Sequence, residues 1–204
     1  MGLLLIALGA EAASSRTILV FGDSLSAAYG LAPQEGWVAL LAQRLLSQGY
    51  GYQVVNASES GETSGGGLER LPRALELHRP GLVILELGAN DGLRGLPVTE
   101  MRANLERMVQ LSRAAGARVL LLGIRIPPNY GPRYTQEFER VFPELANQYH
   151  LPLVPFLLEK VALDPELMQG DGMHPSARGE APVLDTVWPY LVPLLKKKHP
   201  IGGS

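Results

Sequence analysis

A serine, a histidine and an aspartate in this chain are the residue types of a nucleophilic relay. Ser24 follows four apolar residues, 18–21, and a Gly-Asp pair, whereas His174 lies much later, three positions after Asp171. In acyl transfer a serine hydroxyl attacks a carbonyl carbon, a histidine takes the hydroxyl proton, and an acid orients the histidine. An acid three residues before a histidine can reach its nearer ring nitrogen, which leaves the farther nitrogen free to face a serine.

These residues also have purely structural interpretations. Asp23 or Ser24 can cap a helix, and the Asp171-x-x-His174 sequence can be an ordinary loop turn. The other three histidines lie at predicted helix ends, where the helix dipole accounts for them, or in the C-terminal tail. Only His174 therefore combines a loop position with a nearby acid.

Two further loops can supply the donors that an oxyanion needs. Gly61 lies in a loop rich in serine and glycine, and Asn90 follows the most strongly apolar run of the chain, residues 82–87. Backbone N–H groups and an asparagine amide can both point at a developing negative charge. The structural alternatives are a turn glycine at Gly61 and a helix cap at Asn90.

The elements that must position these residues alternate between strands and helices. Short apolar runs predict strands, and apolar residues at helical spacing predict the helices between them. This alternation predicts a three-layer α/β fold, with helices on both faces of a five-stranded parallel sheet. We expect the flavodoxin-like strand order 2-1-3-4-5, whose switch point between the first and third strands brings Ser24 and Asn90 to one crevice. The expected strands are residues 17–21, 52–56, 82–87, 118–124 and 151–156. The expected helices are residues 36–48, 68–78, 99–115, 134–149, with a kink or break near Pro143, and 180–195.

Composition is that of an ordinary globular protein and excludes several functional classes. Of the 204 residues 46% are hydrophobic and 19% are charged, and the formal charge of −2 gives no electrostatic case for binding nucleic acid. The absence of cysteine excludes disulfides, a thiol nucleophile and thiolate metal sites. The sequence contains no His-Glu-x-x-His motif and no P-loop. We therefore expect neither a metal nor a cofactor.

The two ends of the chain differ from residues 13–198, which we interpret as a single domain. Residues 3–8 are apolar, and residues 10–12 have the small-x-small form of a signal-peptidase site. We interpret residues 1–12 as a trimmed or re-started secretory signal, which predicts a periplasmic or secreted bacterial protein; a frayed apolar N-terminus is the alternative. The stretch is too short to span a membrane, so we expect no stable membrane anchor. Residues 199–204 resemble an expression linker.

Four blocks in order resemble those of the SGNH (GDSL) hydrolase family, over residues 17–195. They are Gly22-Asp23-Ser24-Leu25-Ser26, then Gly61, then Gly88-Ala89-Asn90-Asp91, then Asp171-x-x-His174. Three more segments resemble the bacterial periplasmic acyl thioesterase, arylesterase and lysophospholipase group: residues 56–58, 90–94 and 127–131.

The resemblance implies a role for each of five residues. Ser24 is the implied nucleophile, His174 the base and Asp171 its orienter. The implied oxyanion donors are the N–H groups of Ser24 and Gly61 and the side-chain amide of Asn90. The neighbouring Glu62 departs from the pattern, because some members of the group carry aspartate there, and its extra methylene can shift the Gly61 loop.

We therefore expect a serine hydrolase that cleaves carboxylic esters and acyl thioesters through an acyl-serine intermediate, acting as a monomer on small molecules. A deacetylase of glycans or other small acyl groups on the same fold is one alternative, and a non-catalytic binding module is a less favoured one. We also expect acyl chains longer than acetyl to be preferred, because ligand clefts are mostly apolar and apolar residues follow two of the strands. The predicted lining residues are Leu93, Leu96, Ile126, Pro127 and Tyr130.

Overall fold

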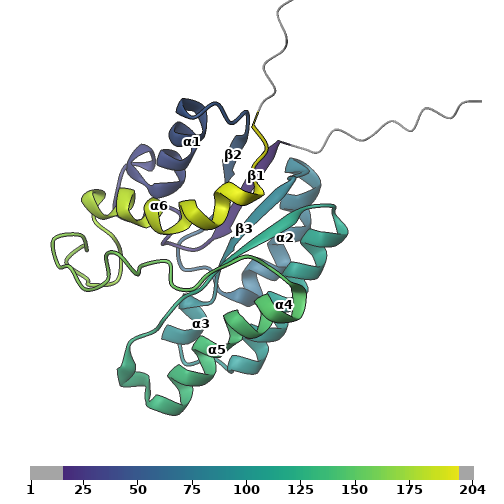
Figure 1. The fold of residues 1–204 in the computed structure, drawn as a ribbon. Helices are drawn as coiled ribbons and strands as arrows, with labels where there is room; N and C mark the ends of the chain where they lie inside the picture. The colour runs from purple at the N-terminus through teal and green to yellow at the C-terminus, as the bar shows by residue number, and fades with distance from the viewer. Residues whose placement is uncertain (1–15, 198–204) are drawn as a thin grey trace, which may run out of the picture.

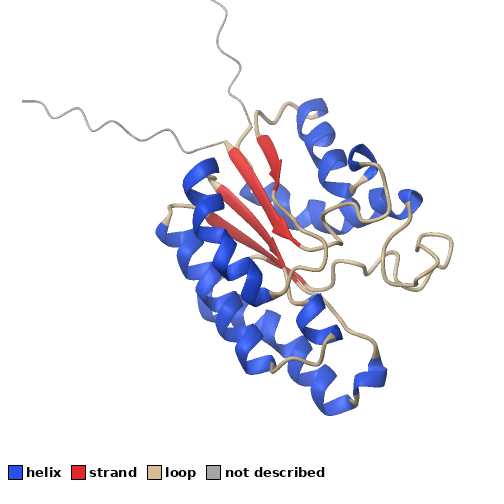
Figure 2. Ribbon diagram, turned by 180° about the vertical axis from the view of Figure 1, so that it is seen from behind, coloured by secondary structure: helices blue, strands red, loops and turns tan. Residues whose placement is uncertain are grey.

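The computed structural model describes residues 16–197, and a five-stranded parallel sheet forms its centre (Figures 1 and 2). The strand order is β2-β1-β3-β4-β5, and every neighbouring pair is parallel, which confirms the expected topology. The expected leader and tail, residues 1–12 and 199–204, lie outside the described residues. The strands are β1 (Thr17–Gly22), β2 (Gln53–Asn56), β3 (Leu82–Glu86), β4 (Arg118–Leu122) and β5 (Leu153–Val154).

Helices cover both faces of this sheet (Figure 1). Helices α1 (Trp37–Ser47) and α6 (Ala177–Leu191) pack on one face. The other face is covered by α2 (Ser64–His78), α4 (Val98–Ala114) and α5 (Pro132–Tyr149). Along β1, Leu19 and Phe21 contribute to one apolar cluster and Ile18 and Val20 to the other. Residues 18–21 of the strand are all apolar because both of its faces are buried.

The second helix, α2, begins at Ser64, four residues earlier than predicted. The side chain of Thr63 caps it by accepting a hydrogen bond from the N–H group of Gly66. A Cβ atom at Gly67 would lie 2.5 Å from a methyl carbon of Leu87. Glycine therefore permits close packing of the first turn of α2 on the residue that follows β3. Glycine also lowers helix propensity, which is why the sequence suggested a loop here.

The other deviations from the predicted elements are local. Helix α5 is continuous from Pro132 to Tyr149 with Pro143 inside it, so of the expected kink or break the break is wrong. Its buried face, with Phe138 and Phe142, packs in the core. Strand β5 has two residues, and a one-turn helix, α3 (Ala89–Leu93), follows β3. Within residues 16–197 no helix is both long and apolar enough to cross a membrane.

Strands β1 and β3 end level with each other at the edge that carries the predicted site. Gly22, the last residue of β1, pairs with Glu86, the last residue of β3. The segments that follow, with Ser24 after β1 and Asn90 after β3, therefore start side by side. This edge is the carboxyl end of the sheet, where open α/β folds bind ligands.

Candidate active site

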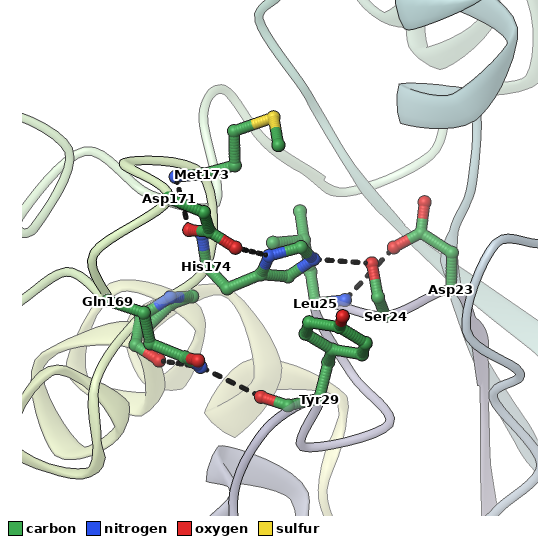
Figure 3. A network of polar contacts seen from close by, with 9 residues as sticks. Asp23, Ser24, Leu25, Tyr29, Gln169, Asp171, Met173 and His174 are labelled. Atoms are coloured by element: carbon green, nitrogen blue, oxygen red, sulfur yellow. Dashed lines mark hydrogen bonds and ion pairs between the residues drawn. The ribbon is translucent and has the colours of Figure 1, made fainter.

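Ser24, His174 and Asp171 form a continuous chain of hydrogen bonds (Figure 3). The Oγ atom of Ser24 lies 2.9 Å from Nε2 of His174. The other ring nitrogen of His174, Nδ1, lies 2.7 Å from Oδ2 of Asp171. The serine comes from the turn after β1, whereas the other two residues come from the irregular segment before α6. The fold thus brings together the three side chains that the sequence analysis selected.

Hydrogen bonds hold Asp171 in its charged form. Its Oδ1 atom accepts the backbone N–H groups of Met173, at 2.9 Å, and of His174, at 3.0 Å. Partial burial opposes ionisation, but these bonds and the histidine ring outweigh it and lower the pKa of Asp171 to about 2. A carboxylate at Nδ1 favours a proton on that nitrogen. The lone pair of Nε2 then faces the serine hydroxyl.

Asp23 caps the turn that carries the nucleophile candidate. Its Oδ1 accepts the N–H group of Leu25 at 3.0 Å, and its backbone oxygen accepts that of Ala27 at 2.9 Å. Residues 24–30 form turns, so Asp23 caps a turn and not the helix that the structural interpretation expected, while the hydroxyl of Ser24 is directed at His174. Burial of Asp23 raises its pKa to about 6.

A second buried acid, Glu86, anchors the same turn and was missed from the sequence. Its Oε2 atom accepts the N–H group of Asp23 at 3.2 Å and the hydroxyl of Ser26 at 2.8 Å. Burial, together with the nearby carboxyl of Asp23, raises the pKa of Glu86 well above its usual range. A Cβ atom at Gly22 would lie 2.5 Å from Oε2, so only glycine fits beside this carboxyl. The available signal was a charged residue inside an otherwise apolar strand.

Asn90 links the segments that follow three neighbouring strands. Its Nδ2 group donates to Oδ2 of Asp23 at 3.1 Å and to the carbonyl oxygen of Glu62 at 3.0 Å. The amide therefore lies close to the nucleophile turn, and both of its hydrogens already have acceptors. An oxyanion beside Ser24 would compete with these two oxygen atoms for the amide.

The loop after β2 is fixed on both sides of Gly61. Gly61 has φ +80°, a left-handed conformation that glycine adopts readily, and its carbonyl accepts Nη2 of Arg94 at 2.9 Å. The carboxylate of Glu62 pairs with Nε of Arg70 at 2.9 Å, and the same guanidinium donates to the carbonyl of Ala57. The longer side chain at Glu62, compared with aspartate, is thus used in an ion pair that ties the loop to α2.

Asn56 is a further residue of this edge that the sequence analysis left without a role. Its Nδ2 group donates to the carbonyl oxygen of Ser26 at 2.8 Å, and its Oδ1 accepts the N–H group of Ser58 at 3.1 Å. The side chain thereby joins the end of β2 to the nucleophile turn. Its position as the polar last residue of the predicted strand 52–56 was the available signal.

The five predicted lining residues lie in two kinds of environment. Leu96 and Tyr130 expose about a third of their surface, at 37% and 36%, and the Tyr130 hydroxyl donates to the carbonyl of Leu93 at 2.8 Å. Pro127 is exposed and Leu93 is half-buried. Ile126 is 6% exposed and belongs to the core cluster beneath α3. In this structure Ile126 offers a ligand little surface, so its place in the lining stays a prediction.

No group of three or more histidine, cysteine, aspartate and glutamate side chains in residues 16–197 is arranged to hold a metal ion.

Comparison with known proteins identifies the family. Residues 20–181 match the model of the GDSL-like Lipase/Acylhydrolase family. The chain is 53% identical over 194 residues to "Esterase TesA" of Pseudomonas aeruginosa, covering 95% of this chain and 96% of that protein. It is 43% identical over 193 residues to "Thioesterase 1/protease 1/lysophospholipase L1" of Escherichia coli strain K12, covering 95% and 91%.

Solved structures agree with this result. The crystal structure of TesA superposes with a TM-score of 0.85 at 55% identity, covering 88% of this chain and 99% of that one. The psychrotrophic esterase EstA from Pseudoalteromonas sp. also gives a TM-score of 0.85, at 43% identity, covering 88% and 98%. Because the family model spans most of the chain and these relatives share its length, the chain belongs to the GDSL-like lipase/acylhydrolase family.

Proposed function

We propose that this protein is a serine hydrolase of carboxylic esters and acyl thioesters, in which Ser24 is the nucleophile, His174 the general base and Asp171 its orienter. The observation that carries the proposal is the chain of contacts from Ser24 Oγ to His174 Nε2, 2.9 Å, and from His174 Nδ1 to Asp171 Oδ2, 2.7 Å. This order of groups is what acyl transfer through a serine requires.

In the acylation step, Ser24 Oγ attacks the acyl carbonyl carbon while its proton passes to Nε2 of His174. The carbonyl oxygen becomes an oxyanion, for which the N–H groups of Ser24 and Gly61 and the amide of Asn90 are the proposed donors. As the tetrahedral intermediate collapses, the bond to the leaving group breaks and His174 gives its proton to the departing alcohol or thiol. The acyl group is then an ester of Ser24.

The deacylation step reverses these roles with water. His174 takes a proton from a water molecule, whose oxygen attacks the acyl carbon. Collapse of the second tetrahedral intermediate returns that proton to Ser24 Oγ and releases the carboxylic acid. Asp171, with its pKa lowered to about 2, stays negative and stabilises the imidazolium that forms in both steps.

The names of the relatives support this range of substrates. They include an esterase, an arylesterase from Vibrio mimicus at 44% identity, and a thioesterase and lysophospholipase. Esters and thioesters with a hydrophobic acyl or aryl part are therefore the proposed substrates. The proposed acyl contacts are the exposed apolar side chains of Leu96 and Tyr130. Leu96 follows Asn90 closely in the chain, and the Tyr130 hydroxyl bonds to the carbonyl of Leu93 in the same segment.

Replacing the nucleophile tests the proposal. Ser24→Ala should remove hydrolysis of p-nitrophenyl butyrate and of an acyl-thioester substrate, and should leave the melting temperature close to that of the wild type. A fluorophosphonate should add one adduct per chain, and peptide mass spectrometry should place it on Ser24. The control is Ser47→Ala, at the exposed end of α1, which should keep full activity. A folded Ser24→Ala protein with wild-type turnover would refute the assignment.

We further propose that the protein is exported to the periplasm and acts there as a monomer. The apolar residues 3–8 and the small-x-small residues 10–12 support export. Expression of the full chain in a bacterial host, followed by cell fractionation and N-terminal sequencing, tests this: a cytoplasmic protein that keeps its intact N-terminus would contradict it. Light scattering after gel filtration tests the oligomeric state.

A further inference from the structure

The segment that carries Asp171 and His174 has little regular structure to hold it. Between β5 and α6 it contains one isolated bridge, between Met168 and Pro175, and its residues 171–173 are exposed. Ser24, in contrast, follows a central strand and lies in a turn anchored by buried carboxyls. A 2.9 Å contact between a rigid turn and an irregular loop needs further interactions to keep the two aligned.

Gln169 provides such an interaction. Its side-chain Nε2 group donates to the carbonyl oxygen of Tyr29 at 2.8 Å (Figure 3). The same group donates to the carbonyl oxygen of Pro175 at 2.9 Å. Its backbone N–H group donates to the carbonyl oxygen of His174 at 2.7 Å. Two hydrogen bonds join the nucleophile segment, residues 23–35, to the histidine segment, residues 164–176, within the described part of the chain. One is the contact of Ser24 with His174, and the other is the bond from Gln169 to Tyr29.

The turn that presents Tyr29 is shaped to receive this glutamine. Ala28, with φ 58°, and Gly30, with φ +75°, both have left-handed backbones on either side of Tyr29. A non-glycine residue rarely adopts this conformation. A Cβ atom at Gly30 would lie 2.5 Å from Oε1 of Gln169, so the turn and the glutamine are in close contact.

Tyr29 itself packs against the histidine. The two ring centroids are 4.5 Å apart and the ring planes meet at 36°. Contact with this ring therefore limits the tilt of the His174 imidazole.

We propose that Gln169 and Tyr29 are positioning residues that hold the His174 imidazole in line with the Ser24 hydroxyl. Gln169 fixes the histidine loop to the nucleophile segment, and Tyr29, held by its carbonyl group, supports the ring. The proposal rests on the proposed function, because it assigns these residues to the same relay. Neither residue takes or gives a proton in the reaction.

The test uses Gln169→Met, which keeps the length of the side chain and removes its donors, and Gln169→Glu, which keeps its shape and places a carboxylate against two carbonyl oxygens. We expect kcat for p-nitrophenyl butyrate to fall about ten- to hundredfold in both, since misplacement by about 1 Å can cost this much. We expect KM to change less than about threefold. The rate of phosphonylation of Ser24 should fall by the same factor as kcat. The control is Gln43→Met, on the exposed side of α1, which should match the wild type.

Tyr29 has its own pair of variants. Tyr29→Phe keeps the ring and should retain wild-type kcat, whereas Tyr29→Leu should lower kcat and leave KM unchanged. A rise in KM alone in Tyr29→Leu would overturn the positioning role, because it would mean that the ring binds substrate.

Retention of wild-type kcat and phosphonylation rates by folded Gln169→Met and Gln169→Glu would likewise overturn the proposal, even if their melting temperatures fell. This failure is distinct from a failure of the proposed function. If only the positioning proposal fails, Ser24→Ala is inactive and the Gln169 variants are fully active. If the proposed function fails, Ser24→Ala itself is active.

Discussion

Glu180 should make the stability of this fold depend on pH in a way that a single substitution removes. The side chain is 2% exposed at the start of α6, and its Oε2 atom accepts the backbone N–H group of Trp37 at 2.7 Å. Burial raises the pKa of Glu180 from 4.5 to about 7, and the bond from Trp37 only partly offsets this effect. The folded state therefore retains a proton that the unfolded chain releases near pH 4.5.

The sign and size of the effect follow from linkage. A carboxyl whose pKa is raised on folding contributes its full stability below the unfolded value of 4.5, and this contribution is lost as the pH rises through about 7. A difference of about 2.5 pKa units corresponds to about 3 kcal/mol, most of which is lost between about pH 5 and pH 8. Glu180→Gln is neutral at every pH and keeps an oxygen for the Trp37 N–H group, so this dependence disappears.

Urea unfolding of the wild type and Glu180→Gln at pH 5 and pH 8 measures the effect. At pH 5 the variant should be the less stable protein, because its amide places an extra donor in a buried site, at a cost of about 1–3 kcal/mol. Between pH 5 and pH 8 the variant should gain about 2–3 kcal/mol relative to the wild type. Taking the difference cancels the titration of all other groups. A difference in unfolding free energy that is the same at both pH values would refute the reasoning.

Two predictions concern the reaction. Asn90→Ala should lower kcat about a hundred- to a thousandfold with little change in KM, which is the usual effect of losing one oxyanion donor. Steady-state kinetics that show a change in KM alone would contradict this role of Asn90. In a series of p-nitrophenyl esters from acetyl to dodecanoyl, kcat/KM should be largest for a medium or long acyl chain, because each buried methylene contributes about 0.8 kcal/mol. Leu96→Glu should reduce this preference for longer acyl chains. A steady decrease from acetyl onward would instead favour a deacetylase.

Much of the architecture could be predicted because the relevant signals are local. Apolar runs such as residues 18–21 mark buried strands, and their alternation with amphipathic helices determines a parallel sheet. The start of α2 could not be predicted in the same way. Gly65, Gly66 and Gly67 disfavour a helix locally, and the close packing of Gly67 on Leu87, which explains the glycine there, is a tertiary contact.

The positions of the site residues were predicted better than their surroundings. Ser24, Asn90 and His174 follow strands or precede the last helix, so topology alone directs them to one edge. Ile126 follows a strand as well, yet its side chain packs under α3, and no periodicity in an irregular loop distinguishes an inward side chain from an outward one. Gln169 is an ordinary polar residue in a loop, and its contact with Tyr29 depends on the arrangement of two distant segments.

Glu86 shows how a departure from the local pattern acquires meaning in the folded chain. An acid at the end of a fully buried strand carries a large desolvation cost, and its Oε1 atom is buried and has no hydrogen-bond partner among residues 16–197. The other oxygen holds both Asp23 and Ser26, the neighbours of the nucleophile, and Asp23 in turn holds the amide of Asn90. A neutral carboxyl lowers the desolvation cost, which agrees with the raised pKa of Glu86. The same buried group thus fixes the proposed nucleophile and, through Asp23, the proposed oxyanion donor relative to the central strands.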